Sequence, residues 1–347
     1  MIISFNPSIF HSRDDEIQNT LAKVLLLLIE NDIHFLDTRS INTIFYNENG
    51  KYIFNSNPVS DYLSPKHQRS LEELLKQKSR KNITNLHRKH LMHIVVGGDE
   101  NNKEIHPKSV FKIITERSKI IVENGINDWN FIRGICQKYS SSKTKRRSIY
   151  ELLDRAIKNE TIESMNCGGL GEMIKVTQQC IEQERYRGIF KYKLMAVLDS
   201  DRNGSGELPK GTNKSTIEHL KGRKVYSTND CTYEPSDLIA WHILYKKKIE
   251  NYMPPNVLLT NIASMTQEQK DDLNSKTYEE LDFTEYSYRN IGISERQIKD
   301  QFPRMFLSSF SYHDFEQRCE HHKVFLSEAE ELVSEIEQIL LKMAKIL

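Results

Sequence analysis

The sequence has few cysteines, and none of them is arranged to form a metal site. The five cysteines are widely spaced, no two stand in a C-x-x-C pair, and none follows the Cys/His spacing of a zinc site. We therefore expect no zinc module, and free thiols in a reducing cytoplasm. The sequence also lacks a G-x-x-x-x-G-K-[ST] motif, so we expect no P-loop ATPase domain in this chain.

Long hydrophobic runs and a strong charge of one sign are missing as well. The longest apolar run, residues 21–29, contains Lys23 and is far shorter than the roughly 20 residues of a membrane span. The first residues lack the basic and apolar order of a signal peptide. Lys and Arg number 49 against 48 Asp and Glu, so any attraction to nucleic acid must be local. We expect a cytoplasmic protein without membrane contact.

Residues 1–110 mix helix and strand signals and predict a separate α+β unit that contacts a partner or substrate. Acidic residues before an apolar run indicate a helix over residues 14–30, and Asn49-Gly50 between two aromatic runs predicts a hairpin. His87, His90 and His93 recur every three residues, which would place them roughly on one helical face. They could contact phosphate or a metal ion, or have no function beyond the fold.

Residues 111–255 alternate between strand and helix signals. Short apolar runs predict strands at residues 118–122, 161–166, 193–198 and 224–228, with helices between them. This order predicts an α/β domain with a parallel sheet flanked by helices. A helix is predicted over residues 235–253. The region 256–347 reads as mainly helical and ends in an amphipathic helix over residues 325–347.

Carboxylates follow two of the predicted strands. Glu123 comes directly after the first strand, and Asp199 and Asp201 come after the third. In open α/β sheets the functional groups gather at the carboxyl ends of the strands, so we expect these three acids in one crevice. They supply the hard oxygen ligands that Mg²⁺ or Mn²⁺ takes, and a bound ion stabilises a phosphoryl group or activates water. The pattern predicts a metal-dependent phosphoryl-transfer centre.

Two other interpretations of these acids stay open. Acidic residues are common in loops at strand ends, and an Asp-x-Asp pair alone is a weak signal. The segment from Asp199 also has acidic and small polar residues at alternating places, as a calcium loop does. Its twelfth position, however, is Lys210 and not the bidentate glutamate of such a loop.

Two basic segments are candidates for phosphate contacts. The loop 140–148 and the run 246–248 concentrate positive charge that could neutralise phosphates or form a solvated surface. The candidate nucleic-acid contacts are Lys143, Lys145, Arg146, Arg147, Lys246, Lys247 and Lys248. Gly168 and Gly169 follow the second predicted strand, where the absence of side chains permits close backbone approach.

The order strand–Glu–Gly, strand–Gly–Gly, strand–Asp-x-Asp resembles the TOPRIM domain. Topoisomerases, DnaG-type primases, RecR-like repair proteins, small maturation ribonucleases and OLD-family nucleases share that domain. The resemblance covers roughly residues 111–254. It implies that Glu123 is a catalytic acid/base or metal ligand and that Asp199 and Asp201 bind the metal. Gly125 would match the family glycine, although Asn124 stands between it and Glu123.

The resemblance also implies further members of the site. Asp128 would be the second acidic ligand of OLD-like proteins. The segment YKKKIENYMP resembles one that follows the TOPRIM core in OLD-like and stand-alone defence nucleases, so Glu250 would join the site. A solvated glutamate in a Lys-rich segment is the alternative for Glu250.

A topoisomerase would need much more chain, and a primase of this type usually carries a zinc module. The resemblance therefore implies a stand-alone, metal-dependent nuclease for DNA or RNA. Such proteins act as toxic effectors of bacterial antiphage defence, with a partner ATPase or sensor protein, and a homodimer is a further expectation. The alternative is a non-catalytic nucleic-acid-binding or regulatory subunit of a larger complex.

Overall fold

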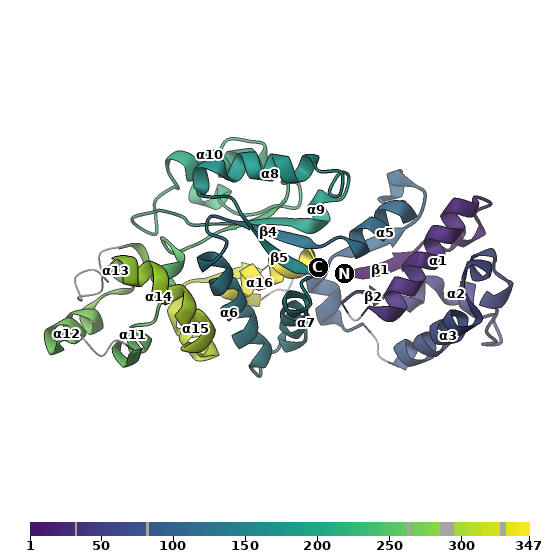
Figure 1. The fold of residues 1–347 in the computed structure, drawn as a ribbon, viewed down its shortest axis with the longest axis horizontal. Helices are drawn as coiled ribbons and strands as arrows, with labels where there is room; N and C mark the ends of the chain where they lie inside the picture. The colour runs from purple at the N-terminus through teal and green to yellow at the C-terminus, as the bar shows by residue number, and fades with distance from the viewer. Residues whose placement is uncertain (32, 81–82, 262–264, 285–294, 327–330) are drawn as a thin grey trace. The chain divides into compact units, whose positions relative to one another are not determined.

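The computed structural model describes residues 1–31, 33–80, 83–261, 265–284, 295–326 and 331–347 (Figure 1). The chain forms two compact units. The N-terminal unit contains Met1–Arg117 with Glu184–Lys193 and Ala344–Leu347, and the larger unit contains Ser118–Gln183 and Leu194–Met343. Each unit has a parallel sheet flanked by helices, which confirms the α/β class. No helix in these ranges is long and apolar enough to cross a membrane.

The N-terminal unit is built on a three-stranded sheet. Strand β1 (Ile2–Phe5) lies between β2 (Phe35–Leu36) and β3 (His93–Val96) and is parallel to both. The prediction of an α+β unit was wrong, because helices connect parallel strands here. The predicted first helix is confirmed as α1 (Asp15–Glu30), capped by the Asp14 carboxylate. The other helices described here are α2 (Asn42–Phe45), α3 (Pro65–Arg80), α4 (Asn85–His90), α5 (Pro107–Thr115) and α9 (Phe190–Lys193).

Two local predictions in this unit had different outcomes. Of the hairpin predicted around Asn49-Gly50, only one antiparallel bridge between Tyr46 and Tyr52 is present, because most of the first aromatic run forms helix α2. The prediction that the three histidines share one helical face is wrong. Helix α4 ends at His90, which is buried, and His93 opens strand β3 with an exposed side chain. The break at residues 91–92 separates the histidines that their spacing had placed together.

The larger unit has a four-stranded parallel sheet in the order β5-β4-β6-β7. Figure 1 shows α8 and α10 on one side of its strands and α6 and α7 on the other. From β4 the chain moves to one side to form β5, and then to the other side to form β6 and β7. The strand order therefore reverses between β4 and β6. The strands are β4 (Ser118–Val122), β5 (Ile162–Asn166), β6 (Leu194–Leu198) and β7 (Ala240–Ile243), and the helices are α6 (Asn127–Ser141), α7 (Arg147–Lys158), α8 (Met173–Glu182) and α10 (Gly211–Lys221).

The fourth strand lies in a segment predicted to be helical. Residues 224–228 form no strand, whereas β7 falls inside the predicted helix 235–253. Ala240, Trp241 and His242 are all buried, and the Trp241 indole donates to Asp237. A strand covered on both faces has no alternation of polar and apolar residues, so its sequence pattern does not separate it from a buried helix.

Helices continue beyond the sheet, but the last predicted helix is only partly present. Helix α14 approaches α6 so closely that a Cβ on Gly134 would lie 2.6 Å from the Phe306 carbonyl oxygen. Residues 323–326 and 331–334 form an antiparallel strand pair, residues 327–330 lie outside the described ranges, and the helix begins at Glu335. The elements are α11 (Pro255–Asn261), α12 (Gln267–Ser275), α13 (Tyr278–Phe283), α14 (Glu295–Ser308), α15 (Tyr312–Cys319), β8 (Lys323–Leu326), β9 (Glu331–Ser334) and α16 (Glu335–Lys345).

Arg146, one of the predicted phosphate contacts, is buried where α6 turns into α7. Its guanidinium donates to Glu337 over 2.9 Å and also to Glu331. The Tyr150 hydroxyl donates to the same Glu337 carboxylate over 2.6 Å. The phosphate-contact prediction was wrong for Arg146, because its side chain joins α7 to β9 and α16 inside the unit.

We predict that Arg146→Met lowers the free energy of unfolding by about 3 kcal/mol, because it leaves the Glu337 carboxylate buried without its cation. Lys143→Met, an exposed position in the same connection, is the matched control and should change stability by less than about 0.5 kcal/mol. Urea denaturation measures both values. Equal effects of the two substitutions would contradict the structural role of Arg146.

Candidate functional site

Glu123 and Asp199 directly follow two neighbouring strands. The register of β4 and β6 pairs Ile121 with Ala196. Extending it by two residues places Glu123 opposite Leu198, the residue before Asp199. Because neighbouring strands lie about 4.8 Å apart, the two carboxylates leave the sheet side by side. They do so where the strand order reverses, which is the usual ligand-binding position of an open α/β sheet.

Five carboxylates interact at this edge of the sheet. Burial raises the pKa of Asp199 well above its usual range, and repulsion from Asp128, Glu250 and Glu123 raises it further. Burial likewise raises the pKa of Asp128 to about 7, and Glu123 and Glu250 add to the shift. The pKa of Glu123 is raised first by burial and then by the charge of Asp201. Repulsion of this kind requires that the groups lie close together.

The loop after β4 explains how Asp128 reaches the other acids. The Asn124 side chain accepts hydrogen bonds from the backbone N–H groups of Ile126 and Asn127, which folds the loop back. The Asp128 carboxylate in turn accepts the Asn124 N–H over 2.9 Å. Gly125 permits the expected close approach, since a Cβ there would lie 2.8 Å from the Asn166 Cβ.

One oxygen of Glu123 is buried without a hydrogen-bond partner among the described residues, and this is its Oε1 atom. The carboxylate also interacts with the backbone N–H of Leu170. Gly168 and Gly169 precede Leu170 with φ angles of +77° and +121°, in the region that favours glycine. A Cβ at either glycine would meet no atom within 4 Å, so backbone conformation and not close approach is what requires them.

Asp201 lies on the exposed rim of the cluster. Its φ angle of +50° is unusual for a residue with a side chain. Asn213 donates to its carboxylate over 3.0 Å, and the Lys248 Nζ lies 3.7 Å from it. The two acids of the Asp-x-Asp pair therefore differ, since Asp199 is half-buried and Asp201 is solvated and paired with a cation.

A buried charge network, which the sequence gave no signal for, holds the Asp-x-Asp loop. The Lys247 carbonyl accepts the backbone N–H groups of Ser200 and Asp201 over 3.0 and 3.1 Å. The Lys247 N–H donates to the Asp282 carbonyl over 2.8 Å. Lys246 and Arg318 each donate to the Asp282 carboxylate over 2.6 Å, and His321 contacts its other oxygen.

The three consecutive lysines 246–248 therefore have different roles. The phosphate-contact prediction was wrong for Lys246, which is fully buried against Asp282. Lys247 donates to the Asn203 side chain over 2.9 Å, and Lys248 faces Asp201. The other basic segment, residues 142–146, follows the far end of α6. Fifteen helical residues at 1.5 Å each place it about 22 Å along the helix from the Asp128 end.

The donor atoms at the sheet edge fit a hard divalent cation, although no ready-made triad is present. Among the described residues, no three Asp, Glu, His or Cys side chains gather around one point. Mg²⁺ usually takes only one or two carboxylates, together with water and substrate phosphates. The orphaned Glu123 oxygen and the half-buried Asp199 are the residues that could hold such an ion, with Asp128 next to them.

Comparison with known protein families, characterised proteins and solved structures gives no match. The interpretation of the site therefore depends on its own geometry and chemistry.

We predict that Asp282→Asn lowers the free energy of unfolding by about 3 kcal/mol, because it leaves the charges of Lys246 and Arg318 buried without their shared carboxylate. Asp272→Asn is the matched control. It removes a carboxylate from an exposed pair with Lys276 and should cost less than about 1 kcal/mol. If urea denaturation gave the same small loss for both variants, the Asp282 network would not stabilise the fold.

A second prediction concerns the pH dependence of stability in the presence of a chelator. An unfolded aspartate titrates near pH 4, whereas the folded pKa of Asp128 is about 7, so the folded state binds the extra proton between these values. Stability is then lost as the pH rises from about 4 to about 7. Asp128→Asn should remove this loss. Above pH 7 the variant should be more stable than the unchanged protein by about 2 kcal/mol. This is half of the free energy that corresponds to a shift of three pKa units, because Asp128 is partly solvated.

Urea denaturation across this pH range measures the difference. Glu182→Gln, at an exposed acid on α8, is the control and should follow the unchanged protein at every pH. A constant difference between Asp128→Asn and the unchanged protein would contradict the raised pKa.

Proposed function

We propose that the chain is a divalent-metal-dependent nuclease that hydrolyses phosphodiester bonds of DNA or RNA at the carboxyl edge of its larger sheet. The observation that carries the proposal is a buried Glu123 oxygen that has no partner in the described part of the chain and lies within a group of mutually repelling carboxylates. A fold gains nothing in stability from such a group. A cation shared with a phosphate would remove the repulsion, so the arrangement favours metal-assisted chemistry on a phosphate.

The proposed role of each residue follows from its burial. Asp199 and Glu123 would hold Mg²⁺ or Mn²⁺, and Asp128 and Glu250 would add negative charge beside them. The ion would supply an activated water and neutralise charge on the phosphoryl group. Burial and the neighbouring carboxylates raise the pKa of Glu123, which favours a role for it as the acid or base. Lys248 stands beside Asp201 on the rim, where it could contact a phosphate.

The absence of a ready-made triad among the described residues favours a second candidate function, a non-catalytic nucleic-acid-binding or regulatory subunit. In that case the same edge would bind phosphate through Lys248 without cleaving it. A role as a toxic effector of antiphage defence, with a partner ATPase or sensor protein, follows from the resemblance of the motifs alone. Metal-dependent cleavage separates the enzyme from the binding subunit.

We predict that the purified protein cleaves plasmid DNA, single-stranded DNA or total RNA only with Mg²⁺ or Mn²⁺. Glu123→Gln and Asp199→Asn should each lower the rate by at least about 100-fold, because each removes a ligand or a proton-transfer group. Both variants should fold as stably as the unchanged protein or more so, since each relieves repulsion.

Glu182→Gln, purified in parallel, controls for contaminating nucleases and should keep full activity. Mg²⁺ should also raise the melting temperature of the unchanged protein more than that of Asp199→Asn. Cleavage that persists in both site variants would contradict the proposed centre. Retained nucleic-acid binding without any cleavage would favour the binding subunit.

A further inference from the structure

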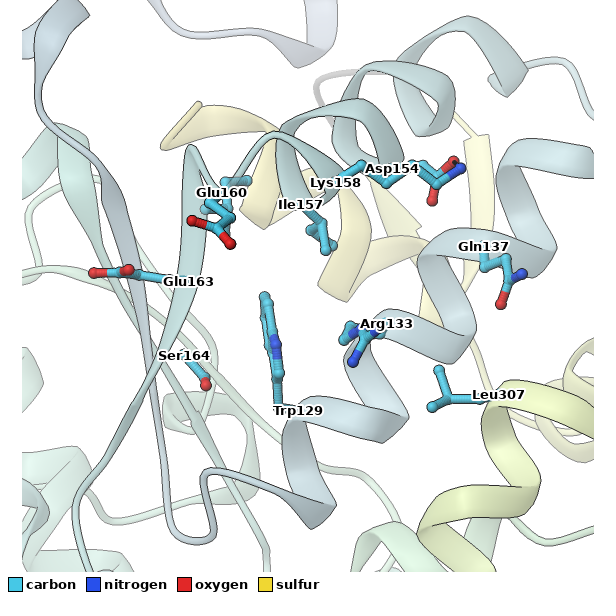
Figure 2. A pocket seen from close by; sticks show the side chains of 11 residues that line it. Trp129, Arg133, Gln137, Asp154, Ile157, Lys158, Glu160, Glu163, Ser164 and Leu307 are labelled. Atoms are coloured by element: carbon cyan, nitrogen blue, oxygen red, sulfur yellow. Dashed lines mark hydrogen bonds and ion pairs between the residues drawn. The ribbon is translucent and has the colours of Figure 1, made fainter.

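A cavity of about 670 Å³ in the larger unit takes no part in the proposed chemistry (Figure 2). Its wall comes from helices α6, α7 and α14 and from β5, the edge strand of the larger sheet. This volume lies within the range of small-molecule binding pockets. Trp129, on its wall, directly follows Asp128 in the sequence, and the lining extends from there to Glu160 and Ile162 at the start of β5.

Two donor side chains lie in this cavity without a partner. Trp129 and Arg133 are four residues apart and so share one face of α6. Figure 2 shows the Trp129 ring between strand β5 and the Arg133 side chain. The structure gives neither side chain a hydrogen bond, ion pair or ring contact within the described ranges. The only other tryptophan, Trp241, is fully buried and bonded to Asp237, so this chain satisfies an indole N–H where no ligand is involved.

The groups around the Trp129 ring select for a particular ligand. A half-exposed indole offers a flat face for stacking, and an arginine offers donors for a phosphate or a base edge. Glu160 and Ser164 also line the cavity, and their oxygens can accept hydrogen bonds. The Glu163 carboxylate instead pairs with Lys119 over 3.3 Å and points away from the Trp129 ring (Figure 2). Carboxylates accept well from the exocyclic amino group of a base and repel a bare phosphate. The cavity therefore suits an amino-bearing base that enters with its phosphate toward Arg133.

We propose that this cavity binds a nucleobase with an exocyclic amino group, stacked on Trp129 and held through its phosphate by Arg133. The inference rests on the proposed function for the source of the base, which is then a nucleotide of the strand that passes the carboxylates. A free nucleotide presents the same chemistry and is the other source. In both cases adenine and cytosine bind more tightly than uracil or thymine, which lack the amino group.

The test measures binding in the presence of a chelator, so that no cleavage occurs. AMP, CMP and UMP, and oligonucleotides of dA, dC and dT, are titrated while tryptophan fluorescence and equilibrium dialysis are recorded. Quenching and tighter binding by the A and C ligands are expected. Trp129→Ala and Arg133→Gln should each weaken binding about 10-fold, with Trp129→Phe restoring most of it. Arg13→Gln, at an exposed arginine of the N-terminal unit, is the control and should have no effect.

Each outcome has a separate meaning. Mononucleotides that bind as tightly as oligonucleotides identify a free nucleotide as the ligand, and tighter oligonucleotide binding identifies the strand. Equal affinity for all bases, or binding unchanged by Trp129→Ala in a folded variant, overturns the proposal. Glu123→Gln should leave base binding intact while abolishing cleavage. Base-selective binding without any metal-dependent cleavage would therefore refute the nuclease proposal alone.

Discussion

Electrostatic repulsion at the carboxyl edge of the larger sheet is the constraint on which the rest of the structure depends. The parallel pairing of β4 and β6 brings Glu123 and Asp199 to one place, and the folded loop after β4 adds Asp128. These groups raise one another's pKa values, so the fold is less stable with all of them ionised. The surrounding elements must hold the two loops in position against this repulsion.

Buried charges elsewhere in the larger unit are paired, which shows that the repulsion is confined to the carboxyl edge of the sheet. Arg146 joins two carboxylates, and the Asp282 carboxylate accepts from both Lys246 and Arg318. These buried charges all have partners of opposite sign. Asp199 has no ion pair with any described residue. The carboxyl edge is therefore left negative beside neutralised buried charges, which is the expected condition of a surface that receives a cation.

The sequence predicted the strands that carry the acids because each is a short apolar run followed by a polar loop. It failed at β7, where burial on both faces removes the alternation that marks a strand, and at β8 and β9, whose residues repeat with helical spacing. Local spacing also could not show that Lys246 and Arg146 are buried, since their partners Asp282 and Glu337 are 36 and 191 residues away. The cavity beside Trp129 is formed by four elements that are separate in the sequence, so the sequence alone did not predict it either.

The path of the chain between the two units has a practical consequence. The chain passes from one unit to the other after Arg117, Gln183, Lys193 and Met343. A single proteolytic cut therefore cannot release either unit as one intact fragment, and neither unit corresponds to one continuous stretch of a gene. Truncation after residue 255, one of the predicted boundaries, would remove segments of both units. Dissection of this protein into independent parts requires circular permutation or co-expressed fragments.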